Sequence, residues 1–240
     1  MIDWLRREHV RPEITLGERV LPIVLRRHPT AKRLTLRLAP DGSEVRLTAP
    51  KWAPTNEAIA FAHARAEWLA GQLAKLPEQL RIAPGASVQF RGQPLLLAHL
   101  PSAPRKGRFA GDSVTFGGPV DGYANRVRRW LEAQGLALME ADLSHFCAAA
   151  GVEPPQLRLT RAQRRWGSCS TGGTVRINWR LVQAPDPVRR SVVAHEIAHL
   201  VHFDHSPAFH ALLGRIFDGD IRAADRWLKD HGRTLYAAFG

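Results

Sequence analysis

Cysteine is nearly absent from this sequence, since Cys147 and Cys169 are the two cysteines among 240 residues. Two thiols can build neither a disulfide framework nor a four-thiolate zinc site. Apolar runs of membrane-spanning length are missing as well, and the segment Met1 to Glu8 has no apolar core of a signal peptide. We therefore expect a cytoplasmic protein with no membrane partner.

Acidic residues are scarce relative to basic ones. Asp plus Glu number 22 against 34 Lys plus Arg, which gives a formal charge of +12. This excess favours anionic partners, so a nucleotide or nucleic acid stands beside a peptide or protein substrate as an expected partner. The basic residues are scattered and no recognised nucleic-acid module occurs, so simple solubility is the competing interpretation.

The N-terminal half predicts a β-rich domain over residues 1–118. Alternating apolar and polar residues on either side of Asp41-Gly42 predict a β-hairpin. Apolar residues at spacings of three and four then predict one helix from Pro54 to about Leu76. Residues 83–118, rich in Gly and Pro, predict short strands and loops.

The C-terminal half, residues 119–240, predicts a second domain of α+β class. A long helix is expected from Tyr123 to Ala150, where Gly151 ends it. Asp186-Pro187 predicts the start of a further helix, with Asp186 as N-cap and the proline as first helical residue. Between these helices we expect a small antiparallel sheet of three strands, at residues 156–160, 164–170 and 174–181.

The second of these helices carries a motif with metal-site spacing. In His195-Glu196-Ile197-Ala198-His199 the two imidazoles lie one turn apart on one helix face, where they can share a metal ion. Glu196 lies beside the pair without being needed as a ligand, so it can take a proton from a metal-activated water. The motif predicts a zinc-dependent hydrolase with Glu196 as general base.

Two histidines compete for the third ligand position. His202 lies about 10 Å along the helix axis from His195 and nearly in line with the pair, so it cannot complete a tetrahedron. His205 precedes Ser206-Pro207, where the helix can end and the chain can turn back. We therefore predict zinc ligation by His195, His199 and His205. His202 is expected either to be exposed to solvent or to hydrogen-bond to one of the ligand residues without touching the metal.

The strands before the metal helix are expected to form one wall of its cleft. Arg165, Asn178 and Arg180 are the predicted substrate contacts, because guanidinium and amide groups hold carbonyl or phosphate oxygens. Surface ion pairing is the competing interpretation for each arginine. Trp166 and Trp179 are expected in the core.

Three further residues near the motif have side chains that could take a chemical role. Cys169 has no triad partner, so we reject cysteine catalysis. Asp204 and Asp225 are both candidates to accept the second N–H of a ligand histidine, and the sequence does not choose between them.

The motifs together resemble the YgjP-like (DUF45) predicted metal-dependent hydrolases, to which the WLM and SprT-like proteases are related. The resemblance implies a zincin-like α+β fold with three histidine ligands, carried here onto His195, His199 and His205. Ser191 and His210 stand where the family usually has an aromatic residue and a tryptophan. The motifs that carry the resemblance are Arg165–Ser170, Asn178–Leu181, His195–His199 and His205–Phe209.

The most direct prediction of function is a zinc metallopeptidase that cleaves peptide bonds by a metal-activated water. Two alternatives keep the same site: hydrolysis of a nucleotide phosphoanhydride, which would use the arginine excess, and a DNA-associated protease. A structural zinc domain is the non-catalytic alternative, against which Glu196 argues because a structural site has no use for a base.

Overall fold

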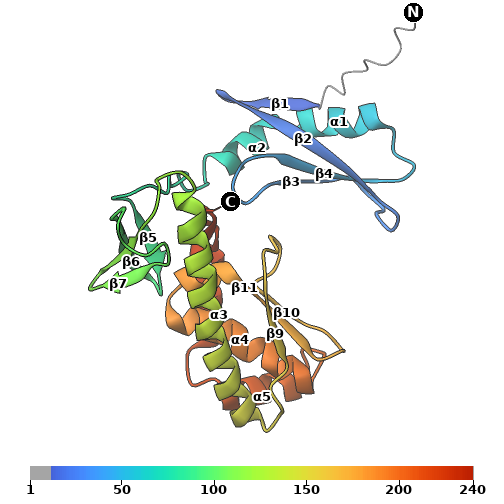
Figure 1. Cartoon of the computed structure of the whole chain (residues 1–240). Helices are drawn as coiled ribbons and strands as arrows, with labels where there is room; N and C mark the ends of the chain where they lie inside the picture. The colour runs from blue at the N-terminus through green and yellow to red at the C-terminus, as the bar shows by residue number, and fades with distance from the viewer. Residues whose placement is uncertain (1–11, 240) are drawn as a thin grey trace, which may run out of the picture. The chain divides into compact units, whose positions relative to one another are not determined.

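The computed structural model describes residues 12–239. The segment Met1 to Glu8, on which the expectation of no signal peptide rests, lies outside the described residues. The chain forms two compact units, which divide between Glu78 and Gln79 and are described separately below (Figure 1). None of the helices within residues 12–239 has the length and apolarity needed to cross a membrane.

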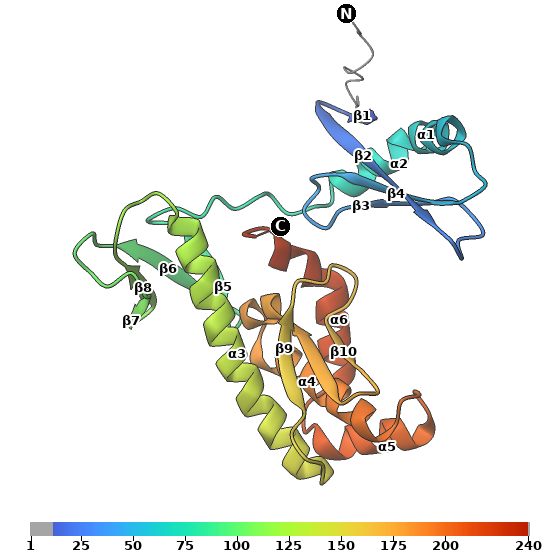
Figure 2. The ribbon, with the colours of Figure 1, turned by 45° about the vertical axis from the view of Figure 1, so that its right-hand side comes forward.

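The first unit is a four-stranded sheet with two helices on one face (Figures 1 and 2). The predicted hairpin around Asp41-Gly42 is confirmed as the antiparallel pair β3–β4. The single helix expected after Pro54 is instead two, because the chain tightens at Arg65, whose N–H donates to the Ala62 carbonyl three residues back. The elements are β1 (Glu13–Leu16), β2 (Arg19–His28), β3 (Thr35–Leu38), β4 (Val45–Pro50), α1 (Thr55–His63) and α2 (Ala66–Leu73).

The core of the first unit follows the strand alternation. Residues that alternate along the strands point toward the two helices, whose small residues Ala58 and Ala62 and the larger Leu69 are fully buried against them. Period-two burial on one face of a sheet is the ordinary result of covering that face alone.

In the second unit, α3 (Tyr123–Ala150) has the bounds predicted from the sequence, and Gly151 ends it in the left-handed conformation at φ 72°. A four-stranded sheet lies beside the N-terminal half of α3 (Figures 1 and 2). The α3 residues Val127, Trp130 and Leu131 pack against this sheet. Because this sheet shares a core with α3, residues 83–118 fall in the second unit, whereas the sequence grouped them with the first. Its strands are β5 (Ser87–Phe90), β6 (Gln93–His99), β7 (Arg108–Ala110) and β8 (Ser113–Phe116).

A three-stranded sheet and a cluster of helices complete the second unit. The sheet has the order β10-β11-β9, with β10 antiparallel and β9 parallel to β11. The expectation of an antiparallel sheet is therefore wrong for β9, because the chain crosses from one edge of β11 to the other before it forms β10. The elements are β9 (Gln156–Thr160), β10 (Gly167–Cys169), β11 (Thr174–Asn178), η1 (Trp179–Gln183), α4 (Asp186–Val201), α5 (Pro207–Ile216), α6 (Ile221–His231) and η2 (Gly232–Tyr236).

The start of α4 differs by one residue from the prediction. Pro185 is the N-cap and Asp186 is already helical, with no side-chain cap. The Asp186 carboxylate instead pairs with Arg91 and Arg189. The β5–β6 turn that carries Arg91 is also held to η1 through the backbone, since the Arg91 N–H donates to the Val182 carbonyl at 2.8 Å.

An ion-pair network joins α3 to α4 in the interior. Arg189 and Asp142 are both nearly inaccessible to solvent, and Arg189 Nε lies 2.8 Å from an Asp142 carboxylate oxygen. Arg189 also pairs with Asp186, and Arg190 lies 3.7 Å from Asp142. Removing Arg189 would leave the buried Asp142 carboxylate with the longer contact to Arg190, while Asp186 keeps its pair with Arg91.

We expect Arg189→Met to lower the free energy of unfolding by about 3–5 kcal/mol, because a buried carboxylate loses its cation without regaining water. Urea denaturation measures the change. The matched control is Arg161→Ala, which breaks the exposed pair between Arg161 and Glu132 and should cost at most about 1 kcal/mol. Equal effects of the two substitutions would contradict a structural role for the buried network.

Candidate metal centre

The helix α4 lies in the middle of the core of the second unit. Four of its residues, Val193, Ala194, Ile197 and Ala198, are fully buried among α3, α5 and the sheet. This packing fixes the rotation of the helix, so that His195 and His199 lie half-buried at the edge of the core and face the same side.

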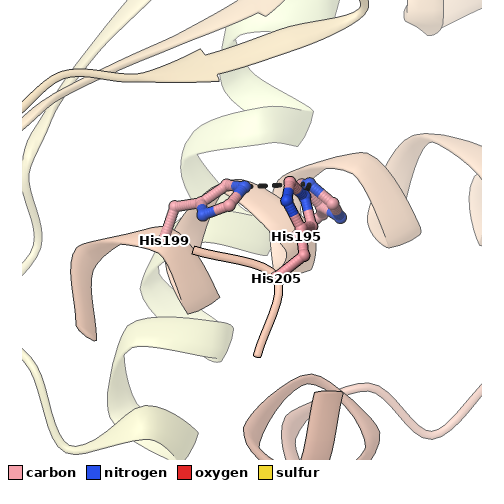
Figure 3. A group of neighbouring side chains, drawn as sticks. All are labelled: His195, His199 and His205. Carbon is pink, nitrogen blue, oxygen red and sulfur yellow. Dashed lines mark hydrogen bonds between the residues drawn. The ribbon is translucent and has the colours of Figure 1, made fainter. Parts of the chain in front are cut away.

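Three histidines converge at the C-terminal end of α4. The helix ends at Val201, and His202 adopts an extended conformation with φ −129° and ψ 108°. The chain then turns back, so that His205 points toward the pair on the helix (Figure 3). His195 Nε2 lies 3.1 Å from His199 Nε2 and 3.3 Å from His205 Nε2. The structure thus brings together the three side chains that the sequence proposed as ligands, in a group that could hold a metal ion.

A backbone hydrogen bond orients the ring of His199. His199 Nδ1 donates to the His202 carbonyl at 3.0 Å, which directs Nε2 toward the other two rings. His202 therefore contributes its backbone carbonyl, a role that the identity of its side chain could not indicate. Burial is the main cause that lowers the pKa of His195 to about 4, with His199 and His205 adding to it. The imidazole of His195 is accordingly neutral near pH 7.

Phe209 forms the floor of the histidine group. Its fully buried ring lies with its centroid 5.0, 4.6 and 4.9 Å from those of His195, His199 and His205. Phe209 was not among the site residues predicted from the sequence. The available signal was Ser206-Pro207, because Ser206 caps α5 by accepting the Phe209 N–H at 3.4 Å and so places this ring in the first helical turn.

Glu196 lies beside the histidines and faces the strand β10. The residue is buried, with 6% of its surface exposed to solvent. Its carboxylate accepts the backbone N–H of Cys169, and the charge of Arg165 acts on it from nearby. Both of these lower its pKa, but burial dominates and raises the pKa to about 7. A carboxyl in this state can exchange a proton near neutral pH.

A cavity of about 220 Å³ opens beside Glu196 and His195. Trp166 and Gly167 line one side of it, and Asp225 in α6 lines another. At Gly167 an added Cβ would lie 2.6 Å from Glu196 Cγ, which is closer than real Cβ contacts come. Glycine at this position is therefore what lets the Glu196 side chain lie flat against β10.

If Glu196 acts as a base at a metal held by the histidines, Gly167→Ala should reduce the reaction rate about a hundredfold while metal content and folding are retained. The methyl group must displace the Glu196 carboxylate, and a misplacement of about 1 Å in a catalytic group costs rate on this scale. The measurement is kcat/KM beside metal content. Gly172→Ala is the matched control, because it lies in the β10–β11 hairpin with nothing within 4 Å of its added Cβ. Full activity in Gly167→Ala would show that the position of Glu196 does not depend on this contact.

Two of the predicted substrate contacts lie elsewhere. Asn178 is fully buried, where its Nδ2 donates to the Ala162 carbonyl at 2.7 Å and its Oδ1 accepts the Arg180 N–H at 3.1 Å. Arg180 is also buried and its Nε donates to the Phe239 carbonyl at 3.0 Å. This corrects the expectation of substrate contact for both, because their polar groups serve the chain's own turns. Arg165 is exposed and acts on Glu196, so it stays a candidate.

The remaining residues near the site are placed as follows. Trp179 is confirmed as a core residue, while Trp166 is half-buried and lines the cavity beside Glu196. Burial raises the pKa of the Cys169 thiol, with a further contribution from Glu196, which agrees with the rejection of cysteine catalysis. Asp204 is fully exposed and accepts the Ser206 N–H at 3.4 Å. Of the two aspartates, Asp225 is the one that lines the cavity.

The two positions at which the sequence departs from the family pattern both lie at the site. Ser191 lines the cavity beside His195, and its hydroxyl donates to the Val188 carbonyl at 2.8 Å. The ring of His210 lies 6.4 Å from that of His205. A small residue therefore stands in the cavity wall at Ser191, and an imidazole stands beside the histidine group at His210.

The α+β fold and a group of three histidines around a central helix are those of the metallopeptidase class. The family model described as YgjP-like, metallopeptidase domain, matches residues 32–231, and the chain belongs to this family. Among solved structures, the crystal structure of the metallopeptidase zymogen of Pyrococcus abyssi abylysin is similar at 22% identity and a TM-score of 0.35, over 38% of this chain and 92% of that chain. The comparison with curated proteins gave no match.

Proposed function

We propose that this protein is a zinc-dependent metallopeptidase, in which His195, His199 and His205 hold the ion and Glu196 is the general base. The observation that carries the proposal is the convergence of three Nε2 atoms at one point beside a buried carboxylate that takes no part in their hydrogen bonding. Membership of a metallopeptidase family supports the same conclusion.

The donor set fits zinc. Imidazole nitrogens about 2.0–2.1 Å from a tetrahedral zinc ion lie about 3.4 Å from one another. The distances of 3.1 and 3.3 Å between the Nε2 atoms are close to that spacing. Three protein ligands leave one position for water or substrate, which is the pattern of catalytic rather than structural zinc sites.

The chemistry divides between the ion and the chain. Zinc, when bound, supplies a Lewis acid that polarises the scissile carbonyl and makes the attacking water more acidic. Glu196 accepts a proton from this water and passes it to the leaving amine nitrogen. The Cys169 N–H orients the carboxylate, and Phe209 excludes water from the far side of the histidine group.

An extended peptide suits the wall of this site. β10 is the outer strand of its sheet and lies beside α4. The Asn178 N–H bonds to the Trp166 carbonyl and the Ser170 N–H to the Thr174 carbonyl, so the backbone groups of Gly167 and Cys169 point away from β11. The Cys169 N–H on this edge is used by Glu196, so a substrate strand would pair with the remaining backbone groups of Gly167 and Cys169. Arg165 is placed to hold a carbonyl or carboxylate oxygen of that strand.

The test is a substrate panel with the wild-type protein beside Glu196→Gln, in which unfolded proteins, peptides and nucleoside triphosphates are assayed together. We expect wild-type protein to cleave peptide bonds and the variant to leave them intact. Hydrolysis of nucleoside triphosphates alone would replace the peptidase proposal by the phosphoanhydride alternative. Cleavage of protein only when DNA is added would support the DNA-associated protease.

A further inference from the structure

A second and larger cavity, of about 620 Å³, lies at the N-terminal end of α3. None of the residues that line it also lines the cavity beside Glu196. Figure 2 shows this end of α3 beside the sheet β5–β8, at the opposite end of the helix from α5. The volume lies within the range of small-molecule sites, which is about 300–1,000 Å³.

The lining of this cavity is strongly basic. Arg105 and Lys106 come from the loop after β6, and Arg126 and Arg129 come from α3, against one acidic residue, Asp121. Among residues 12–239, none of these four cations lies within 4.0 Å of a carboxylate oxygen. Like charges gathered around one concave space repel each other, so an anion that entered it would be stabilised.

The walls are fixed by close backbone contacts. The Gly117 N–H donates to the Pro104 carbonyl at 2.9 Å, and a Cβ at Gly117 would overlap the Ala103 carbonyl oxygen. A Cβ at Gly107 would lie 2.8 Å from Trp130 Cδ1. The loop that carries Arg105 and Lys106 is thus pressed onto β8 and α3, so its backbone is already ordered before an anion binds.

Arg126 is already engaged by the backbone, and the start of α3 adds positive potential at the same place. The side chain of Arg126 is held by the Asp121 carbonyl, to which its Nη1 donates at 3.0 Å, and by the Pro119 carbonyl. The helix α3 begins at Tyr123, directly beside these residues, and the first turn of a helix presents unpaired N–H groups and a partial positive charge. Asn125 in this turn adds an amide to the lining.

From this cavity we propose that the protein binds a small anion carrying two or more phosphate groups at Arg105, Lys106, Arg126 and Arg129. The guanidinium groups of Arg105 and Arg129 can pair with phosphate oxygens in two-pronged contacts, while Arg126, whose Nη atoms hold the backbone, contributes its charge. Four cations against one carboxylate match a polyphosphate better than a single phosphate. The volume of about 620 Å³ suits a small molecule, and binding of a nucleic-acid backbone is an outcome of the test below. This site is separate from the metal centre and does not depend on the proposed peptidase activity.

The test is calorimetric titration of the full chain with inorganic tripolyphosphate at low salt. We expect saturable binding of one anion per chain, and we expect Arg105→Ala and Arg129→Ala each to weaken it about tenfold or more, because each removes a charge-assisted contact. Both side chains are open to solvent at the cavity wall, so their loss should not affect folding, whereas Arg126 is left intact because it holds the backbone. Arg37→Ala, at an exposed arginine in β3, removes the same charge elsewhere and should leave the affinity unchanged.

Three results would overturn the proposal. Equal weakening by Arg37→Ala would mean that the anion is attracted by net charge alone. Binding that survives Arg105→Ala and Arg129→Ala but is lost in His199→Ala would place the anion on the metal. An oligonucleotide that binds more tightly than tripolyphosphate, with an affinity that grows with its length, would indicate a nucleic-acid surface. A nucleoside triphosphate that binds as tightly as tripolyphosphate, or more tightly, would support the site and separate phosphate recognition from nucleoside recognition.

Discussion

Glu196→Gln is expected to remove hydrolysis while zinc content and folding stay close to those of the wild-type protein. The amide keeps the size of the side chain, and its oxygen can still accept the Cys169 N–H that holds the carboxylate. It cannot accept a proton from the attacking water. General-base assistance contributes about two to four orders of magnitude in rate, so a loss in this range is expected.

The measurement is the turnover rate on the substrate found in the panel, together with zinc content by elemental analysis. Glu140→Gln is the control, because it makes the same chemical change at an exposed position of α3. Near wild-type turnover in Glu196→Gln would exclude Glu196 as the base. Loss of activity together with loss of zinc would instead point to a structural effect on the neighbouring ligands.

His205→Ala is expected to deprive the protein of its zinc, whereas His202→Ala should leave zinc affinity unchanged. His205 contributes a ring nitrogen to the group of three histidines. Loss of a residue that only hydrogen-bonds to a ligand lowers metal affinity roughly 10–100-fold, and loss of a ligand itself should lower it further. His202 acts on His199 through its backbone carbonyl, which alanine retains.

Competition with a chelator of known affinity measures both variants on the same scale. His195→Ala and His199→Ala should behave like His205→Ala. Full zinc occupancy in His205→Ala together with loss of zinc in His202→Ala would overturn the ligand assignment. Circular dichroism of each variant without metal shows whether the fold is kept.

The parts of the site that follow from helix periodicity could be predicted from the sequence. The spacing of His195 and His199 fixes one face of a helix, and Ser206-Pro207 marks where the chain leaves that helix, so the convergence of three histidines was an inference from local geometry. Gly167 could not be found in this way, because its importance arises from the contact between β10 and α4, which no local pattern encodes. For Phe209, Ser206-Pro207 places the residue in the first turn of α5, but its packing under the three histidines is a tertiary contact.

Asn178 and Arg180 show the opposite error. Their amide and guanidinium groups suggested substrate contact, but both side chains donate hydrogen bonds to backbone carbonyl groups of the chain. A residue type gives its hydrogen-bonding capacity but not the partner that will use it. The direction of β9 was missed for a similar reason, because strand patterns do not show which edge of β11 a strand joins.

The turn between α4 and α5 links the proposed zinc site to the lifetime of the protein. His195 and His199 belong to the end of one helix, His205 to the turn itself, and Phe209 to the helix that follows. An ion bound by all three histidines holds this turn in place, and the three side chains come together only in the folded state. At a free metal concentration 100 times the dissociation constant, such binding adds about 2.7 kcal/mol to the free energy of unfolding. If the site holds zinc as proposed, supply of the metal should set how much of the protein persists as well as how much is active.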